Sequence, residues 1–342
     1  MKKVLFATTA LVATAGMAAA EVTLGGYGRF GLYYQENAAG TNETRVEQRF
    51  RLTITGSTVA DNGLEFEGRI RFQTDENGDG ASNTANTSAA GFAVSTGGFR
   101  LDVGNVSNVI DSGDVVNYFG YGVGLTSSIE QSNGFGNTAV GFGTSETFNT
   151  VAPTIKLRYN VGDFTVSVSY TDDAATTATA FETAATLATG TPPVAGSLTG
   201  AGTTAGGGNS SYQLGASYSF GNYAVGAVIG SNETAGGTGP DNDEWIIGFT
   251  GEFGALAVSA IVGDSDAQGL AGNSTSFGLS AKYDISAATE LRFVYADNGA
   301  AMNAETYGIG FIQGLGGGVS LRGGIGESGG TTIADLGVVF NF

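Results

Sequence analysis

The amino-acid sequence predicts an all-β protein that forms a sixteen-stranded antiparallel β-barrel across a membrane. Two observations carry this prediction: apolar and polar residues alternate along many short segments, and the connections between these segments alternate between short and long. Hydrophobic residues make up 41% of the chain, yet no segment after residue 20 has the roughly 20 consecutive apolar residues of a membrane-spanning helix. Because only helices and closed barrels satisfy their backbone hydrogen bonds in lipid, a membrane form of this chain must be a barrel.

The alternation is clearest in the hairpin on either side of Asp61–Gly63. From Leu64 to Gln73, apolar residues or glycine alternate with charged or amide residues, and Arg49–Thr55 shows the same pattern before the turn. Successive side chains of a strand point to opposite faces. This hairpin therefore has one apolar face and one charged face.

The same pattern recurs to the end of the chain and gives an even number of candidate strands, as expected of bacterial single-chain barrels. The sixteen candidates are Val22–Tyr34, Arg49–Thr55, Leu64–Gln73, Phe92–Val94, Phe99–Val103, Ile155–Val161, Phe164–Tyr170, Tyr212–Phe220, Tyr223–Ile229, Trp245–Phe253, Leu256–Val262, Phe277–Tyr283, Leu291–Tyr295, Tyr307–Phe311, Val319–Ile325 and Leu336–Phe342.

The connections between candidate strands sort by length. Short turns such as Val161–Asp163, Phe220–Asn222 and Phe253–Ala255 alternate with long polar stretches at about 77–90, 105–150, 172–209, 232–243 and 265–274. Aromatic residues such as Tyr159 and Phe164 lie next to the short turns. Short periplasmic turns, long external loops and an aromatic girdle at the membrane surface are typical of transmembrane barrels.

The first twenty residues read as a cleaved secretory signal. Met1–Lys3 is a short basic head, Val4–Met17 is apolar or small, and Ala18–Ala20 is a small-residue exit. We expect residues 1–20 to be removed and residues 21–342 to form the barrel.

Composition excludes several function classes. The chain has no His and no Cys, which excludes His-based triads, His-containing zinc sites and disulfides. Removing Lys2 and Lys3 takes the formal charge from −18 to −20, which argues against nucleic acid as a partner. No paired carboxylates suggest a catalytic site, and a secreted adhesive solenoid would need a fixed short repeat. We therefore predict that the protein is not an enzyme.

Four segments resemble the general porins of the Rhodobacter type from alphaproteobacteria. They are the mature start Glu21–Gly26, the turn and strand Asp61–Phe66, the hairpin Tyr218–Tyr223 and the closing segment Ala334–Phe342. The resemblance covers essentially the whole mature chain. It implies a homotrimer in the Gram-negative outer membrane, in contact with lipid and lipopolysaccharide. It also implies a third long loop, about 105–150, folded into the lumen of each barrel, and passive diffusion of small hydrophilic solutes and ions.

Candidate pore-lining residues come from the polar phase of the first three strands, that is, from the alternate positions that carry polar side chains. That phase carries six basic residues: Arg29, Arg45, Arg49, Arg51, Arg69 and Arg71. In one interpretation, Glu47, Glu65 and Glu67 neutralise them and stiffen the wall. In the other, which the resemblance suggests, the arginines face loop acids such as Asp111, Asp114 and Glu130 across a constriction, where charge and width set selectivity.

A second candidate site is a calcium loop. Asp75, Asn77 and Asp79 match the first ligand positions of a D-x-N-x-D-G motif, but Asn86 stands where its distal Glu belongs. A polar connection between two strands explains these residues equally well. The channel itself requires no cofactor, and calcium is an optional ligand.

Two other functions stay open at this point. A substrate-selective channel for sugars or anions would display an aromatic track in the lumen, where only Tyr27 and Tyr33 fall on the polar phase. A surface or adhesive barrel without transport is the other. Small residues in the first strand, Gly25, Gly26, Gly28 and Gly31, would permit close approach of a neighbouring subunit.

Overall fold

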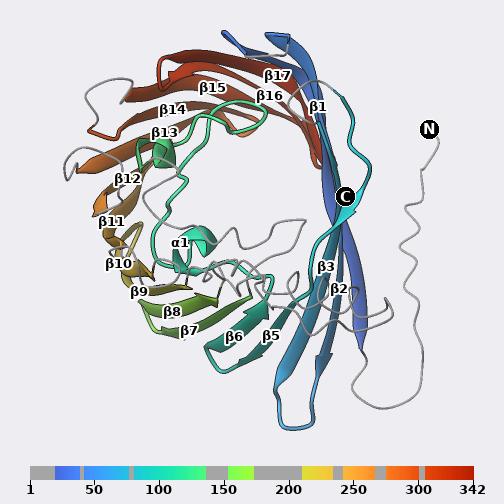
Figure 1. The fold of residues 1–342 in the computed structure, drawn as a ribbon, viewed down its shortest axis with the longest axis vertical. Helices are drawn as coiled ribbons and strands as arrows, with labels where there is room; N and C mark the ends of the chain where they lie inside the picture. The colour runs from blue at the N-terminus through green and yellow to red at the C-terminus, as the bar shows by residue number, and fades with distance from the viewer. Residues whose placement is uncertain are drawn as a thin grey trace, which may run out of the picture.

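The computed structural model describes residues 20–38, 42–76, 81–135, 153–172, 210–233, 242–265, 275–299 and 305–342. Its strands form one antiparallel sheet that closes on itself, because β1 pairs with β2 on one side and with β17 on the other. Figure 1 shows the strands arranged as a ring, with the segment that contains α1 inside it.

Most strands are about ten residues long. Their bounds are β1 Glu21–Gln35, β2 Thr44–Val59, β3 Glu65–Asp75, β4 Asn86–Thr87, β5 Gly91–Thr96, β6 Phe99–Gly104, β7 Thr154–Val161, β8 Phe164–Asp172, β9 Ser210–Phe220, β10 Tyr223–Glu233, β11 Asn242–Phe253, β12 Leu256–Ser265, β13 Ser276–Ser286, β14 Thr289–Asp297, β15 Glu305–Gly316, β16 Val319–Ser328 and β17 Thr331–Asn341. Two short helices, α1 Val109–Ser112 and η1 Gln131–Phe135, lie between β6 and β7. Neither of them has the length or the apolar character to cross a membrane.

The predicted sixteen-stranded antiparallel barrel is confirmed, with one addition. The two-residue strand β4 pairs with Phe72 and Gln73 at one end of β3, while β5 pairs with Glu65–Arg69 at the other end. Together β4 and β5 occupy one position in the ring, so the seventeen strands of the sheet make a barrel of sixteen positions.

The side chains divide between the two faces of the wall as the alternation predicts. In β7, for example, Ile155 and Leu157 are exposed on the outer face, while Lys156 between them is buried on the inner face. An outward apolar band and an inward polar face suit a barrel in lipid. Next to the short turns the rings of Phe99 and Tyr159 stack with centroids 4.0 Å apart.

The two rims differ in the length of their connections. One rim carries turns of a few residues, as between β7 and β8 or β9 and β10, and the opposite rim carries the long connections. The exception on that opposite rim is the tight turn Gly329–Gly330 between β16 and β17, where both glycines have positive φ.

The glycines of β1 lie close to other parts of the same chain, and their role in the approach of a neighbouring subunit stays a prediction. A Cβ on Gly28 would lie 2.3 Å from Cζ of Phe340, and one on Gly26 would lie 3.0 Å from Cζ of Phe342. On the inner face, a Cβ on Gly31 would lie 2.7 Å from a methyl group of Leu125. The physical reason is the pairing of β1 with β17, which lays the two aromatic rings over the glycines at the closure of the barrel.

Candidate functional site

The inner wall is the candidate site because it collects the positive charge of the chain. Of the 14 Lys and Arg residues, Lys2 and Lys3 lie within the first twenty residues, and all the others lie on strands in the inward-facing phase. Six of them are the arginines of β1–β3 that the sequence singled out. Sequence reasoning missed the other six, Arg100, Lys156, Arg158, Lys282, Arg292 and Arg322. The same test of alternation, applied to β6, β7, β13, β14 and β16, would have found them.

Acids neutralise several of the six predicted arginines, and one of these acids, Glu47, was suggested by the sequence. Arg29 pairs with Glu47 at 2.6 Å, as expected. Arg45 pairs with Glu76 at 3.0 Å, and Arg49 forms an ion pair with Asp75. These partners lie on β2 and at the end of β3, where the register of the hairpin sets Arg49 opposite Asp75.

Glu65 and Glu67 have other partners than those expected. Glu67 pairs with Arg100 of β6 at 3.4 Å, and Glu65 accepts a hydrogen bond from Ser95 of β5 at 3.4 Å. The physical reason is that β5 follows β3 in the ring, so the end of β3 that carries these acids is covered by the β5–β6 hairpin.

An aromatic ring and an amide contact Arg51 of this wall. The guanidinium carbon of Arg51 lies 5.5 Å from the centre of the Tyr27 ring, and Nε of Arg51 donates to Gln73. Arg71 is only 3% exposed, so it offers little of its surface to the lumen. The two lumen tyrosines therefore hold arginines in place, since Tyr33 likewise lies 4.2 Å from Arg45.

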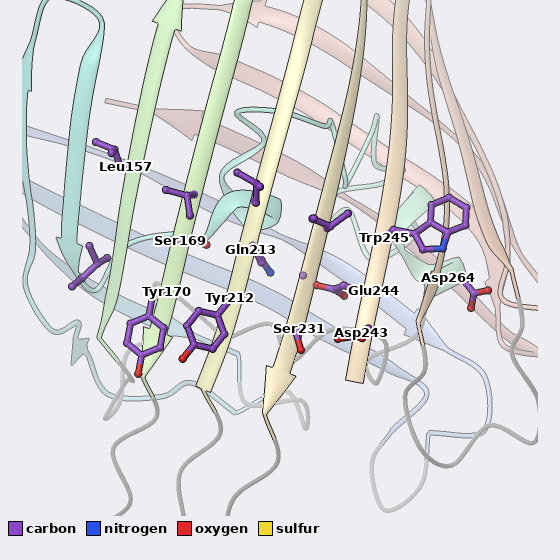
Figure 2. Close-up of a pocket in the computed structure, with 15 residues that line it drawn as sticks. Leu157, Ser169, Tyr170, Tyr212, Gln213, Ser231, Asp243, Glu244, Trp245 and Asp264 are labelled. Atoms are coloured by element: carbon purple, nitrogen blue, oxygen red, sulfur yellow. The ribbon is translucent and has the colours of Figure 1, made fainter. Parts of the chain in front are cut away.

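The segment from Asn105 to Phe135 crosses the inner face of the barrel (Figure 1). Its first anchor is α1, whose N-terminus is capped by the Asn108 side chain. The backbone N–H of Val109 donates to Oγ of Ser169 at 3.2 Å, and that of Ile110 donates to Oε1 of Gln213 at 3.1 Å. Figure 2 shows Gln213 extending from β9 toward α1, behind the strands.

Apolar packing holds the next part of this segment against β10–β12. One buried cluster joins the segment to the inner face of the wall: Val109, Ile110, Val115, Val116, Tyr118 and Phe135 with Val228, Ile246 and Ile261. The interior of the barrel therefore contains a small dry core on one side. Burial of apolar side chains stabilises such a contact by about 1.5–3 kcal/mol for each large residue.

The tip of the segment is held by Asp335 of β17. Its carboxylate accepts hydrogen bonds from the N–H groups of Leu125 and Thr126 at 2.7 and 2.9 Å, and from the Thr126 hydroxyl at 2.8 Å. Arg292 of β14 donates to the carbonyl oxygen of Gly122 at 3.0 Å. Further along, Gln131 exchanges hydrogen bonds with Ser259 and Ser280 at 3.0 and 2.8 Å.

Glycines of the inner wall make room for this segment. A Cβ on Gly226 would lie 2.1 Å from the carbonyl oxygen of Val115, and one on Gly278 would lie 2.1 Å from that of Gln131. The inward-facing glycines under the segment continue from β9 to β17: Gly215, Gly226, Gly248, Gly263, Gly278, Gly308, Gly310, Gly324, Gly326 and Gly337. Sequence reasoning missed their role, although their recurrence on the polar phase of successive strands was a signal.

The three predicted loop acids lie in different surroundings. Asp111 is in the first turn of α1. Asp114 pairs with Lys156 at 2.8 Å and with Arg158, both of β7; burial opposes its ionisation, but these two cations outweigh burial and lower the pKa of Asp114. Asp114 also shares a cavity of about 310 Å³ with Arg69. Burial raises the pKa of Glu130 to about 7, and a hydrogen bond from Ser132 opposes the rise only in part.

The calcium residues are only partly within the described chain. The carboxylate of Asp75 accepts hydrogen bonds from Arg49 and Gln73, so a cation there would compete with an ion pair. Asn77 and Asp79 lie outside the described residues. Within the described ranges, no three acidic side chains are grouped so that they could hold a metal ion.

A second hollow, of about 830 Å³, lies on the outer face of β7–β12 (Figure 2). Tyr170, Tyr212 and Trp245 line it from the outward-facing positions, and the buried polar residues Ser169, Gln213 and Glu244 also border it. Because this surface belongs to the lipid-facing side, it does not compete with the inner wall as the functional site.

Comparison with known proteins agrees with this geometry. A family model described as Gram-negative porin matches residues 7–332. The porin of Fuscovulum blasticum is 32% identical over 170 residues, 46% of this chain and 53% of that porin, so the match spans about half the length of this curated relative. Two solved structures of Rhodopseudomonas blastica porin mutants are 25% and 26% identical, with TM-scores of 0.71 and 0.70; each alignment covers 94% of this chain and 100% of the other.

Proposed function

The chain belongs to the Gram-negative porin family, and from this premise we propose that its barrel is a water-filled channel for passive diffusion of small hydrophilic solutes and ions. It is an outer-membrane protein, and the family indicates a channel rather than an enzyme. One observation carries the proposal: a closed ring of strands presents apolar side chains outward and collects every basic residue after residue 20 on its inner face. A charged inner wall suits hydrated solutes better than apolar ones.

The narrow section of this channel would lie between the arginine wall of β1–β3 and the inner segment 105–135. Arg29, Arg45, Arg49, Arg51, Arg69 and Arg71 are the proposed basic side, and Asp111, Asp114 and Glu130 are the proposed acidic side. The anchors of the inner segment on β8–β17 support this arrangement, because they hold most of it against that part of the wall, while its tip reaches Gly31 of β1. Charges of opposite sign across a narrow lumen would orient water and disfavour apolar solutes.

Liposome swelling with sugars of graded size tests the proposal. Vesicles that contain the refolded protein should swell at rates that fall smoothly with solute size and do not saturate with concentration. A saturable preference for one sugar would instead support the substrate-selective channel. Vesicles that do not swell with any solute would contradict both the general channel and the substrate-selective channel. A surface barrel without transport would then be the remaining function.

We also propose that the protein is a homotrimer in contact with outer-membrane lipid and lipopolysaccharide. The Rhodopseudomonas blastica porin that shares its fold supports a common architecture. In planar bilayers the purified protein should give conductance steps that close in threes. Single closures of unrelated size would contradict a trimer.

Two sequence predictions stay predictions. Cleavage after residue 20 would leave Glu21 at the N-terminus of the mature protein, which N-terminal sequencing can test. Calcium at Asp75, Asn77 and Asp79 is optional for the proposed channel, and a calorimetric titration of the assembled protein that gives no heat would end that idea.

A further inference from the structure

Arg322 of β16 differs from lumen arginines such as Arg29 and Arg292 in its electrostatic partners. Its Nε donates to Oγ of Ser320 at 3.1 Å. No ion pair joins it to a carboxylate among the residues that the structure describes. By contrast, Arg29 pairs with Glu47 at 2.6 Å and Arg292 pairs with Glu290 at 2.7 Å. Arg322 therefore carries a positive charge that its surroundings leave uncompensated.

The charges nearest to Arg322 do not cancel its positive charge. Those that act on it are Arg292, Glu290 and Arg29. Because Glu290 is already bound to Arg292 and Glu47 to Arg29, each of these pairs is close to neutral, and the charge of Arg322 is left over. An anion that entered this region would meet a net positive potential.

The side chain of Arg322 is also accessible from the lumen. It belongs to the inward-facing phase of β16 and is half-buried. Among the described residues, its two terminal nitrogens are neither in an ion pair nor buried without a partner. A guanidinium has five N–H donors in a planar fork that suits oxyanions, and in the described part of the chain the Nε donor binds Ser320.

The position of Arg322 places it beside the narrow section proposed above. The tip of the inner segment lies over Gly324, where a Cβ would be 2.8 Å from the backbone nitrogen of Gly124. Arg322 is the previous inward-facing residue of the same strand, on the side of the short turns. A solute that passes the tip of the segment would therefore meet Arg322 next.

We propose that Arg322, with the hydroxyl of Ser320, forms a contact site for small inorganic anions on the short-turn side of the narrow section. The Ser320 hydroxyl accepts from Nε of Arg322 and keeps its own proton for the anion. This inference rests on the proposed channel function and names the residue that would hold anions within it.

Planar-bilayer recording with inorganic phosphate as the probe tests this site. In potassium chloride, added phosphate should reduce the chloride current of the wild-type channel in a saturable way. In Arg322→Gln the phosphate concentration for half-maximal reduction should rise about tenfold, because charge-assisted hydrogen bonds are lost. For Arg322→Lys, which keeps the charge but not the planar fork of donors, this phosphate concentration should lie between those of the wild type and Arg322→Gln. Such a result would also show that the site tolerates substitution.

Lys282→Gln is the matched control, because it removes one positive charge from the same lumen. Lys282 lies over the ring of Tyr121, 5.8 Å from its centre. We expect this variant to leave the half-maximal phosphate concentration within about twofold of wild type, well under the tenfold change of a lost charged contact. Equal effects of Lys282→Gln and Arg322→Gln, or no effect of Arg322→Gln, would overturn the contact site while leaving the channel intact. A wild-type protein without conductance would overturn the channel itself and the site with it.

Discussion

At the scale of single residues, the ion pairs of the lumen depend on which strands become neighbours. Asp114 shows this dependence, because its partners Lys156 and Arg158 are more than 40 positions away in the sequence. The side chains of Asp114 and Lys156 are 11% and 7% exposed. Removing one member of such a buried group leaves the other charges uncompensated.

We expect Asp114→Asn to destabilise the barrel by about 3 kcal/mol, since two cations lose their carboxylate. Urea unfolding of the protein refolded in detergent micelles measures this loss. Asp61→Asn, in the exposed turn between β2 and β3, removes the same charge from the outside and should change stability little. Equal unfolding midpoints for the two variants would show that Asp114 does not anchor the inner segment.

Glu130 makes the attachment of the inner segment depend on pH. Its pKa is raised from 4.5 to about 7 by burial, so the folded state holds the proton more tightly than the unfolded state. The stability that this group contributes is then fully present below about pH 4.5 and falls as pH rises toward 7. The loss is no more than about 3 kcal/mol.

Glu130→Gln should remove this dependence, because an amide does not ionise. Hydrogen exchange of the backbone amides around η1, followed by mass spectrometry, compares the two proteins at the same pH. We expect greater protection in the variant at pH 8 and equal protection at pH 4.5. Greater protection in the wild type at pH 8 would contradict a buried, uncompensated carboxylate.

Sequence reasoning recovered the side of the wall on which a charged residue lies, but not its partner. The phase of alternation is local, so Arg29 and Arg49 were placed on the inner face from their neighbours alone. Their partners depend on register and on the order of strands in the ring. Glu47 and Glu67 were both suggested as acids that neutralise the arginines of β1–β3. Glu47 pairs with Arg29 of that group, whereas Glu67 pairs with Arg100 of β6.

At the scale of elements, glycines decide how closely the inner segment can lie on the wall. Gly278→Ala would place a Cβ 2.1 Å from the carbonyl oxygen of Gln131, so the backbone of η1 must move away. We expect the single-channel conductance to change and the hydrogen exchange of η1 to accelerate. Because backbone must move, the effect should be comparable to overpacking a core, about 1–3 kcal/mol.

Gly56→Ala is the matched control for Gly278→Ala. Gly56 lies within β2, and a Cβ at this position would meet nothing within 4 Å. This variant should keep the wild-type conductance and exchange rates. If both variants behave like wild type, the inner-wall glycines do not set the position of the segment.

Strand positions were predicted well, and strand ends and β4 were not. The alternation of Arg49–Thr55 gave the centre of β2, but the strand extends from Thr44 to Val59. Near the rims a strand leaves the apolar layer, so its residues no longer need to alternate. The two residues of β4 are too few for any periodic pattern, and they pair with β3 because of where the chain returns.

At the scale of the whole molecule, stability depends on the closure between the first and last strands. Tyr27–Gln35 of β1 pairs with Ile333–Asn341 of β17. Deleting residues 331–342 would leave the edges of β1 and β16 unpaired, and in lipid each unpaired backbone group costs several kcal/mol. We expect the truncated chain to give neither a heat-modifiable band on electrophoresis nor any conductance.

Phe342→Ala separates the ring at the C-terminus from the strand that carries it. This variant keeps the pairing of β17 and loses the stacking of Phe342 on Phe50, whose ring centres are 5.4 Å apart. It should still fold and conduct. The temperature at which heating changes its mobility on electrophoresis should be lower than that of the wild type. A truncated chain that conducts would show that the ring can close without β17.

The overall architecture could be predicted from sequence because lipid imposes a rule on every strand at once. Alternation, turn length and the missing helical span all follow from that one solvent. The path of the inner segment is not under this rule. Its anchors on Ser169, Gln213, Ser259, Ser280 and Asp335 come from five separate strands, and no local pattern in the segment announces them.

The confinement of all basic residues after residue 20 to the strands separates two kinds of evolutionary change. Loops exposed outside a cell vary fastest among relatives, and phages or antibodies that bind them favour that variation. In this chain, substitutions in the external connections leave every existing basic residue of the permeation path in place. Lineages could thus diverge in what recognises them while inheriting the same ionic interior.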